Sequence, residues 1–448
     1  MHSYVRESEL SCRFVQDEAM IVNRATNTWH RLNPVGAMIF EHLEAPASLH
    51  GIVDHLQQNL DLSRVPAEEI RDDVQDFITH LLANNLIRDE STPPLPRGRL
   101  CLDDWRDDMD ATGSELMIPV WAKIEISTRC HLDCVHCYIP GRERHPRGTQ
   151  KVTHAEKEMS TADIYAAIDQ LAEIGSILLT ITGGEIFIRR DIIDILQYAH
   201  DRGFILELFT SATPLTPAKI ATLAALNIGR IQVSIYSHDE ATHDAVTTSK
   251  GSWKRSIRAV REMVRQGIHV DFASTLMRDN HQDAKALRAF AESLGATCSY
   301  GYPITARTDG NRDTHRVRLN DEELQSAITA LPEFFALPQL KRPEDRICSA
   351  GLNMCSITST GEVLPCSQFH MPLGNSKRQP IAEIWQNSPA LKTWRQIRMK
   401  DLKPSEAGSL DRYVGLCPGL NLLEEGDYLV PAKITAETTL AVVDTLES

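Results

Sequence analysis

The chain has 448 residues, of which 42% are hydrophobic and 24% charged, and this length and composition predict a folded protein of two or three domains. A formal net charge of −14 argues against nucleic acid as the main partner, because binding phosphates requires a positive surface. The sequence has neither a run of roughly 20 apolar residues that could span a membrane nor the apolar core of a signal peptide, so we expect a cytoplasmic protein that binds no membrane.

The first region, residues 1–92, predicts a small domain in which strands precede three helices. Strand-like runs cover 13–22 and 28–32, and apolar residues then recur at helical spacing. The clearest helical stripe is formed by Ile70, Val74, Phe77, Ile78 and Leu81. A hairpin followed by three helices is typical of a winged-helix-like domain. The proline-rich sequence that follows predicts a linker or ordered crossover over 93–117.

The second region, residues 118–340, alternates strand-like and helix-like segments. The predicted strands are 122–127, 177–182, 205–210, 230–235, 270–276 and 298–304. Helical patterns between them include 191–202, 217–226, 253–266 and 284–294. Six βα units imply an α/β fold with a parallel sheet, and periodicity leaves open whether this sheet is a partial barrel or an open one. In either case ligands are expected at the C-terminal ends of the strands.

A group of three cysteines follows the first predicted strand of this region. Cys130, Cys134 and Cys137 form a C-x3-C-x2-C pattern, and cysteines in a reducing compartment serve metals or chemistry more often than disulfides. Three thiolates can each bind one iron of a [4Fe–4S] cluster and leave the fourth iron for another ligand. A structural zinc site needs four ligands, for which His131 or His136 is available. The spacing and the position favour the cluster.

This cysteine pattern, together with a Thr-Gly-Gly-Glu turn at 182–185 after the second strand, resembles the radical S-adenosylmethionine (SAM) superfamily. The resemblance covers the whole second region and implies a partial (β/α)6 TIM-like barrel. It also implies that SAM binds the fourth iron and yields a 5′-deoxyadenosyl radical that abstracts a substrate hydrogen. Glycines in the turn allow close backbone approach, and a carboxylate suits the SAM ammonium. The residues that this resemblance assigns to SAM are Tyr138, Thr182, Gly183, Gly184, Glu185 and Ser234.

The third region, residues 341–448, contains a second group of cysteines. Cys348 and Cys366 lie in a C-x12-G-x4-C pattern that resembles the opening of a SPASM domain, the auxiliary-cluster extension of peptide-modifying radical SAM enzymes. The later SPASM cysteines are missing except for Cys417, so the resemblance implies a reduced SPASM or twitch domain with one auxiliary [4Fe–4S] cluster. Its fourth ligand could be Cys355, an oxygen or nitrogen ligand, water or a substrate thiolate. Cys355 equally fits a buried packing residue, and complete loss of this cluster stays open.

The first region resembles a PqqD-like peptide-recognition element through Trp29-His-Arg-Leu32-Asn33 and Gly36. A DNA-binding winged helix is the alternative. The helix predicted over 68–84 opposes it, because five acidic residues against one arginine would repel phosphate. A leader peptide could instead add a strand beside the hairpin. Fusion of the two domains would then raise the effective concentration of the peptide at the barrel.

Together these resemblances predict a radical SAM oxidoreductase that modifies a ribosomally made precursor peptide, with the leader bound by residues 1–92. A cross-link is the expected product, while epimerisation and backbone cleavage stay open, as do the hydrogen donor and any general base. An electron donor such as flavodoxin or ferredoxin is implied. The alternatives are a radical SAM enzyme that acts on a folded protein or a small molecule, and an iron–sulfur winged-helix regulator.

Overall fold

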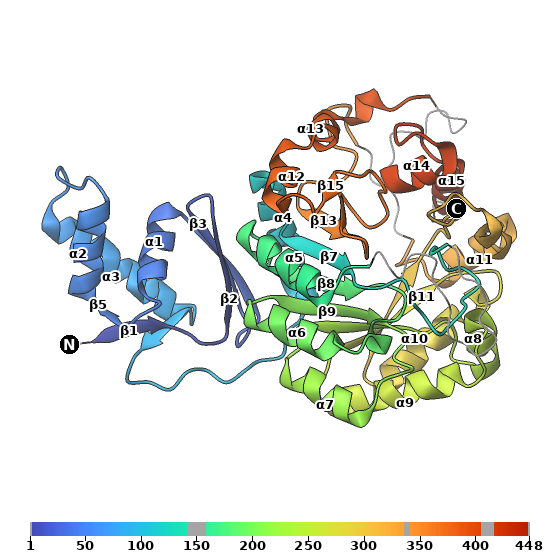
Figure 1. Cartoon of the computed structure of the whole chain (residues 1–448), viewed down its shortest axis with the longest axis horizontal. Helices are drawn as coiled ribbons and strands as arrows, with labels where there is room; N and C mark the ends of the chain where they lie inside the picture. Colours follow the sequence, from blue (N-terminus) through green and yellow to red (C-terminus); the bar gives the residue numbers. More distant parts are fainter. Residues whose placement is uncertain (1, 141–157, 336–340, 405–415, 447–448) are drawn as a thin grey trace.

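The computed structural model describes residues 2–140, 158–335, 341–404 and 416–446. Figure 1 shows a small N-terminal domain, in blue, on one side of a large α/β core, with the C-terminal segments, in orange and red, packed on that core.

The N-terminal domain contains two small sheets and three helices. Its strands are β1 (Ser3–Arg6), β2 (Leu10–Val15), β3 (Glu18–Asn23), β4 (Thr28–Leu32), β5 (Ala47–Ser48) and β6 (Ile87–Asp89). Its helices are α1 (Pro34–His42), α2 (Leu49–Asn59) and α3 (Ala67–Ala83). One sheet has the order β5-β1-β6 and the other the order β2-β3-β4. The three predicted helices are confirmed.

The single strand predicted over 13–22 is wrong. Two antiparallel strands, β2 and β3, occupy this stretch and are separated by Gln16 and Asp17. Both residues adopt positive φ angles of 54° and 66°, which reverse the chain. The polar run Gln16-Asp17-Glu18 separates the apolar residues of the two strands, so the turn does have a signal in the sequence.

Residues 93–117 are ordered and fasten the N-terminal domain to the core. They contain a short 3-10 helix, η1 (Leu102–Asp104), and helix α4 (Arg106–Leu116). A direct hydrogen bond also joins the N-terminal domain to the core, because the Nε of Arg13 donates to the carbonyl oxygen of Ser176 at 2.6 Å. One hydrophobic cluster joins all three parts: Met20, Val22, Leu100, Leu102, Trp105, Met109, Ile118, Val120, Ile177, Leu178 and Ile205.

The core sheet begins with six parallel strands in sequential order, as predicted. They are β7 (Trp121–Glu125), β8 (Leu178–Thr182), β9 (Ile205–Thr210), β10 (Arg230–Ser234), β11 (Val270–Thr275) and β12 (Thr297–Gly301). Three strands of the third region extend the β7 edge: β13 (Met354–Ile357), β14 (Glu362–Leu364) and β15 (Gly374–Asn375). Strand β13 pairs in parallel with β7, so the third region continues the core sheet.

Helices cover one face of this sheet. In the core they are α5 (Thr161–Glu173), α6 (Ile192–Asp201), α7 (Pro217–Ala225), α8 (Glu240–Thr247), α9 (Ser252–Arg265), α10 (Ala284–Ser293) and α11 (Asp321–Ala330). The third region adds the helices α12 (Ile381–Asn387), α13 (Pro389–Gln396), α14 (Pro418–Glu425) and α15 (Lys433–Leu446). Short 3-10 helices are η3 (Ile186–Ile188), η4 (His281–Asp283), η5 (Asp313–Val317) and η6 (Met399–Asp401).

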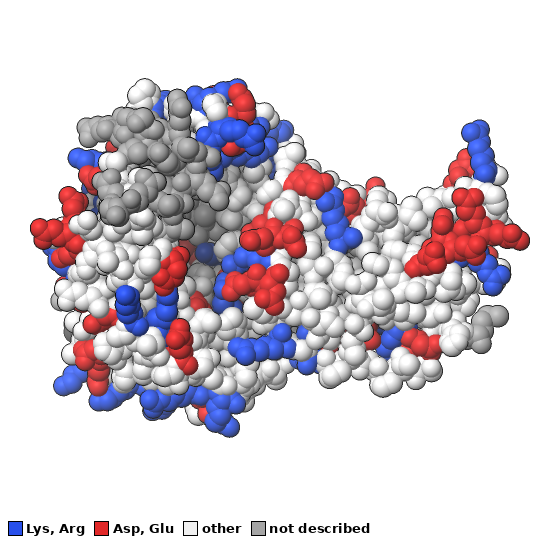
Figure 2. All heavy atoms as spheres, turned by 180° about the vertical axis from the view of Figure 1, so that it is seen from behind, with Lys and Arg blue, Asp and Glu red and all other residues white. Residues whose placement is uncertain are grey.

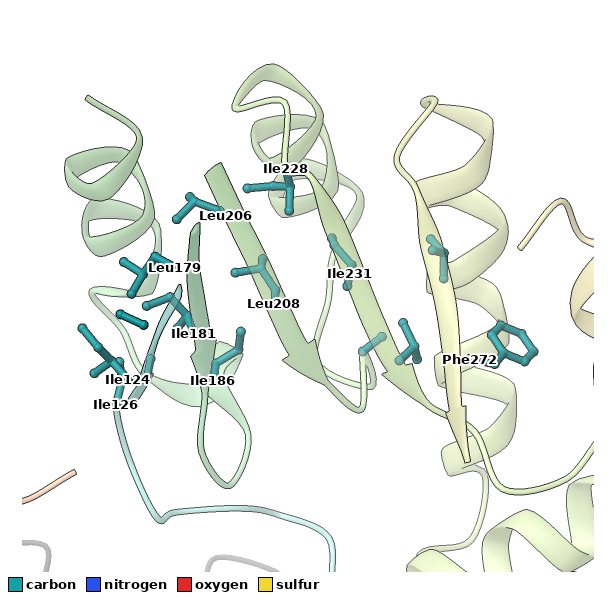
Figure 3. Close-up of a cluster of buried hydrophobic side chains, with 14 of the residues drawn as sticks. Ile124, Ile126, Leu179, Ile181, Ile186, Leu206, Leu208, Ile228, Ile231 and Phe272 are labelled. Carbon is teal, nitrogen blue, oxygen red and sulfur yellow. The ribbon is translucent and has the colours of Figure 1, made fainter. Parts of the chain in front are cut away.

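The main hydrophobic core lies between the sheet and these helices. Figure 3 shows buried side chains of neighbouring strands, among them Leu179, Leu208 and Ile231, beside the helices that cover the sheet. Burying each leucine or isoleucine side chain stabilises the folded state by about 1.5–3 kcal/mol. This core fixes the strands and leaves their other face and their C-terminal ends free to form a site. No helix among the described residues is long and apolar enough to cross a membrane.

Candidate functional site

The face of the sheet opposite the main core borders a cavity of about 570 Å³. Side chains alternate along each strand, so Ile231 and Val233 of β10 enter the core while Gln232 lines the cavity. Lys123 of β7 and Phe209 of β9 also line it. The polar residues within these apolar strands therefore mark the wall of the cavity.

Cys130, Cys134 and Cys137 all line this cavity, and none forms a disulfide. They lie in the loop after β7, at the C-terminal edge of the sheet, where ligands were expected. Cys130 is buried, and its Sγ accepts a hydrogen bond from the N–H of Leu132 at 3.4 Å. Such N–H···S bonds stabilise thiolate ligands of iron–sulfur clusters. The structure thus brings the three predicted ligands to one cavity.

The Gly-Gly turn after β8 runs directly against the cysteine loop. The N–H of Gly184 donates to the carbonyl oxygen of Ser127 at 2.8 Å. A Cβ atom on Gly183 would lie 2.2 Å from that same oxygen, and one on Gly184 would lie 2.3 Å from the carbonyl oxygen of Arg129. Both positions therefore require glycine. Thr182 and the two glycines line the cavity.

The side chain of Glu185 has a different environment from the rest of this turn. It is fully buried and does not line the cavity. Its carboxylate accepts hydrogen bonds from the Thr210 hydroxyl at 2.7 Å, from the Ser211 N–H at 2.8 Å and from the Phe187 N–H at 3.1 Å. Glu185 therefore joins the turn after β8 to the end of β9.

Tyr138 and Ser234 line the cavity from two sides. The Tyr138 hydroxyl donates to Oε1 of Glu125 at 2.9 Å. Burial raises the pKa of the Glu125 carboxyl above its usual range, and the hydrogen bond from Tyr138 partly offsets this. Ser234 ends β10, and the buried Tyr236 hydroxyl hydrogen-bonds with Ser234 and with Cys134.

Two residues that sequence reasoning missed hold the ends of the cysteine loop. The carboxylate of Glu158 accepts from the N–H of Thr128 at 2.8 Å. The guanidinium of Arg307 donates to the carbonyl oxygen of Cys137 at 2.8 Å and pairs with Asp313 at 2.6 Å. Each lies far from the cysteines in the sequence, so no local spacing could reveal them.

The second group of thiols forms around the start of α14. Burial raises the pKa of the Cys348 thiol to about 12, and the nearby thiols of Cys366 and Cys417 raise it further. Burial likewise raises the pKa of the Cys417 thiol, and the Cys366 thiol adds to this effect. The sulfur of Cys348 accepts from the N–H of Ala350 at 3.3 Å, and that of Cys417 from the N–H of Leu420 at 3.5 Å.

Cys355 lies apart from this group. It belongs to β13, where it pairs with Ala122 of β7, and its side chain is part of the main hydrophobic core. Burial alone raises the pKa of its thiol to about 12, with no contribution from the other thiols.

Among the described residues, no group of three or more His, Cys, Asp or Glu side chains converges on a single metal ion. The cysteines of a [4Fe–4S] cluster bind different irons and need not meet at one point. His131, one candidate zinc ligand, places Nε2 against the hydroxyl of Thr213.

Three family models match the chain in the order that the sequence predicted. The model of coenzyme PQQ synthesis protein D (PqqD) matches residues 18–87. The model of the radical SAM superfamily matches 124–291, and that of an iron–sulfur cluster-binding domain, SPASM, matches 348–408.

Individual relatives are more distant. The chain is 25% identical over 336 residues to an AdoMet-dependent heme synthase of Methanosarcina barkeri, covering 68% of this chain and 93% of that protein. It is 24% identical over 307 residues to a PqqA peptide cyclase of Bradyrhizobium diazoefficiens, covering 64% and 77%. The fold is similar to that of Streptococcus suis SuiB bound to its precursor peptide SuiA, with a TM-score of 0.63, 16% identity and coverage of 97% and 100%.

Proposed function

We propose that this chain, which carries a PqqD domain, a radical SAM domain and a SPASM domain in that order, modifies a ribosomally made precursor peptide by SAM-dependent radical chemistry and forms a cross-link. The observation that carries this proposal is the composition of the central cavity. The three cysteines of the radical SAM motif line it together with Ser367, Gln368 and His370 of the third region. A substrate bound there would contact both the core and the SPASM domain.

Cys130, Cys134 and Cys137 would hold a [4Fe–4S] cluster at the top of the cavity. When bound, this cluster and SAM supply a carbon-centred radical that removes a hydrogen atom from the substrate. The backbone of 182–184, which borders the cavity, and the side chains of Ser234 and Tyr138 would contact SAM. We propose that Glu185 affects SAM binding indirectly, by holding the glycine turn in place. Its carboxylate already accepts hydrogen bonds from Thr210 and Ser211 at the end of β9.

Cys348, Cys366 and Cys417 would hold one auxiliary cluster. Cys417 caps α14 at its N-terminus, where the N–H of Leu420 donates to its sulfur and partly offsets the burial that raises the pKa of its thiol. Its sulfur lies 3.7 Å from Oε1 of Gln368, which lines the cavity, so the auxiliary site adjoins the substrate space. We place Cys355 outside the ligand set and in the core.

The N-terminal domain would bind the leader as a winged-helix-type element. Strands β2 and β4 are the edges of their sheet among the described residues, and an edge strand can pair with a peptide. The acidic side chains of α3 are exposed, and Figure 2 shows acidic residues gathered on the outer part of this domain. Such a surface disfavours DNA.

A small-molecule substrate is the second candidate. It is favoured by the match to the heme synthase, 93% of which aligns with this chain. That match leaves about a third of the chain unaligned, whereas the fold similarity to SuiB covers 97% of it. A peptide substrate would account for the PqqD domain, and a small-molecule substrate would not.

The test is co-expression of the full chain with short peptides encoded beside its gene, followed by mass spectrometry. Each cross-link should remove two hydrogens from the peptide, and the Cys134→Ala variant should leave the peptide unmodified. If SAM cleavage were stimulated by a tetrapyrrole and by none of the peptides, the second candidate would replace the first.

A further inference from the structure

Helix α9 presents a row of cations on the outside of the core. Lys254, Arg258, Arg261 and Arg265 are spaced by four, three and four residues, which places them on one helix face. All four are exposed. Figure 2 shows lysine and arginine side chains along the lower edge of the core, the edge where α7 and α9 lie in Figure 1. This is a local positive surface on a chain whose net charge is −14.

The same four cations border a groove of about 520 Å³ between α7 and α9, with apolar residues between them. Glu262 is the one carboxylate among the described lining residues, and it pairs with Arg265 at 2.6 Å. Lys254 pairs with Glu240 at 3.0 Å. Arg258 and Arg261 form no ion pair with any residue that the structure describes, so their charges are available to a partner. The apolar residues of the groove are Leu215, Pro217, Ile220, Trp253, Ile257 and Ala259.

The groove is linked to the cysteine loop by a short series of hydrogen bonds. Ser256 of α9 donates its hydroxyl to the carbonyl oxygen of Ser211 at 2.7 Å. The Ser211 hydroxyl lies 2.9 Å from that of Thr213, which contacts Nε2 of His131. His131 follows Cys130 in the chain. Only a few side chains therefore separate the groove from the first cluster ligand.

A second connection runs through the start of α9. The hydroxyl of Ser252 lies 2.7 Å from that of Thr247 at the end of α8. The carbonyl oxygen of Thr247 accepts from the N–H of Asp133 in the cysteine loop at 3.2 Å. The N-terminal turns of α9, which contain Ser252 and Ser256, therefore belong to the structure that supports the loop.

We propose that the groove between α7 and α9 docks an acidic one-electron carrier protein that reduces the cluster on Cys130, Cys134 and Cys137. This inference rests on the proposed function, because radical cleavage of SAM requires an electron that the chain itself does not supply. In the step, the reduced carrier loses one electron and the cluster gains it, and no atom or proton is exchanged.

Charge complementarity favours an acidic protein as the partner and this groove as its docking site. An acidic carrier is repelled by most of a chain with a net charge of −14, so the cationic groove steers it to one orientation. Unpaired arginines around an apolar centre are also what a transient protein interface needs. In that orientation, the carrier would lie on the helix whose Ser256 begins the hydrogen-bonded series through Ser211 and Thr213 to His131.

The experiment compares two double charge reversals in the full chain, R258E/R261E in the groove and R378E/K392E on the third region. Arg378 and Lys392 are likewise exposed, so the control makes the same change in net charge. A purified flavodoxin, reduced to its hydroquinone, is the probe. Its dissociation constant is measured by biolayer interferometry at several salt concentrations, and 5′-deoxyadenosine is measured with flavodoxin and, separately, with dithionite.

For R258E/R261E we expect flavodoxin binding at low salt to weaken by about tenfold or more, since steering by a charged patch changes association by at least that factor. The ratio of flavodoxin-supported to dithionite-supported SAM cleavage should fall similarly. R258Q/R261Q should lose less in the same direction, and the control should match the parent.

Three results would overturn the proposal: equal flavodoxin binding by parent and R258E/R261E, an unchanged cleavage ratio, or displacement of flavodoxin from the parent by RNA or anionic vesicles at lower concentration. Absence of SAM cleavage even with dithionite would instead count against the proposed function, so the two failures are distinguishable.

Discussion

The N–H of Gly184 donates to the carbonyl oxygen of Ser127 at 2.8 Å, so the glycine turn and the cysteine loop form one unit. Each provides a different part of the proposed SAM site, the turn its backbone and the loop its thiols. Moving one would misplace the other, and this dependence can be tested at the point of closest approach.

Gly184→Ala should disrupt the site without unfolding the core. Its Cβ would lie 2.3 Å from the carbonyl oxygen of Arg129, and backbone atoms on both sides can separate only by moving the loop. A displacement of this size costs about 100-fold in rate when reacting groups must be aligned. Dithionite-driven formation of 5′-deoxyadenosine checks this. Gly51→Ala is the matched control, because its Cβ meets only an ordinary contact at 3.6 Å.

Glu185→Gln should lower both the melting temperature and SAM affinity. The carboxylate accepts from Thr210, Ser211 and Phe187, and a glutamine amide would turn an N–H₂ group toward one of these donors. Leaving buried polar groups unpaired costs about 1–3 kcal/mol. Calorimetry would give the melting temperature and the dissociation constant for SAM. A weaker SAM affinity at an unchanged melting temperature would indicate instead that Glu185 contacts SAM directly.

The sequence predicted the core well because its strands carry strong local signals. The strand predicted over 205–210 coincides with β9, and all of its residues except Phe209 are buried. The three cysteines and the glycine turn were found because chemistry fixes their spacing. The pairing of β13 with β7 was not predicted, because it joins residues more than 200 positions apart.

Residues that support the site were missed for the same reason. Glu158 and Arg307 act on the cysteine loop through hydrogen bonds between residues well apart in the sequence, which leave no pattern in the chain. Ser234 was assigned to SAM because a serine at a strand end fits the radical SAM resemblance. Tyr236 was given no role. The helix predicted over 253–266 was found, but the common face of its cations and their closeness to the cysteine loop required the fold.

Stability should fall between about pH 6.5 and pH 4 because of His243. Burial lowers the pKa of this imidazole to about 4, while the neighbouring Asp244 carboxylate opposes the shift. Its Nδ1 accepts from the N–H of Tyr236 at 3.2 Å, so the folded state requires the neutral ring. The unfolded chain takes up the proton first, near pH 6.5, and unfolding is favoured progressively until the folded state also protonates near pH 4. The loss should be at most about 3 kcal/mol.

Urea unfolding at pH 7 and pH 5 would measure this loss. His243→Asn retains an acceptor near Nδ1 and removes the titration, so its stability should change less over the same interval. Equal pH dependence in the parent and in this variant would show that other groups determine the acid sensitivity.

Iron content should separate the two groups of cysteines. In the proposed site, the radical SAM motif would supply ligands for one cluster, and Cys348, Cys366 and Cys417 would supply ligands for one more. Protein reconstituted without oxygen should therefore bind about eight irons, and replacing Cys130, Cys134 and Cys137 together should leave about four. Cys355→Ala should keep all of them, because its thiol lies in the core beside Ala122. Colorimetric iron analysis and EPR of the reduced protein check these values.

Each alternative count has its own meaning. About twelve irons in the parent would show that the third region holds a second auxiliary cluster on ligands outside this set. About four would show that Cys348, Cys366 and Cys417 are structural thiols and that the third region serves as a scaffold. A loss of iron in Cys355→Ala would return Cys355 to the ligand set, and this would require β13 to separate from β7, since their pairing holds that side chain in the core. If the fourth position of the auxiliary cluster is open to the substrate, a thiol-containing peptide should shift its EPR signal, and it should do so equally in Cys355→Ala and in the parent.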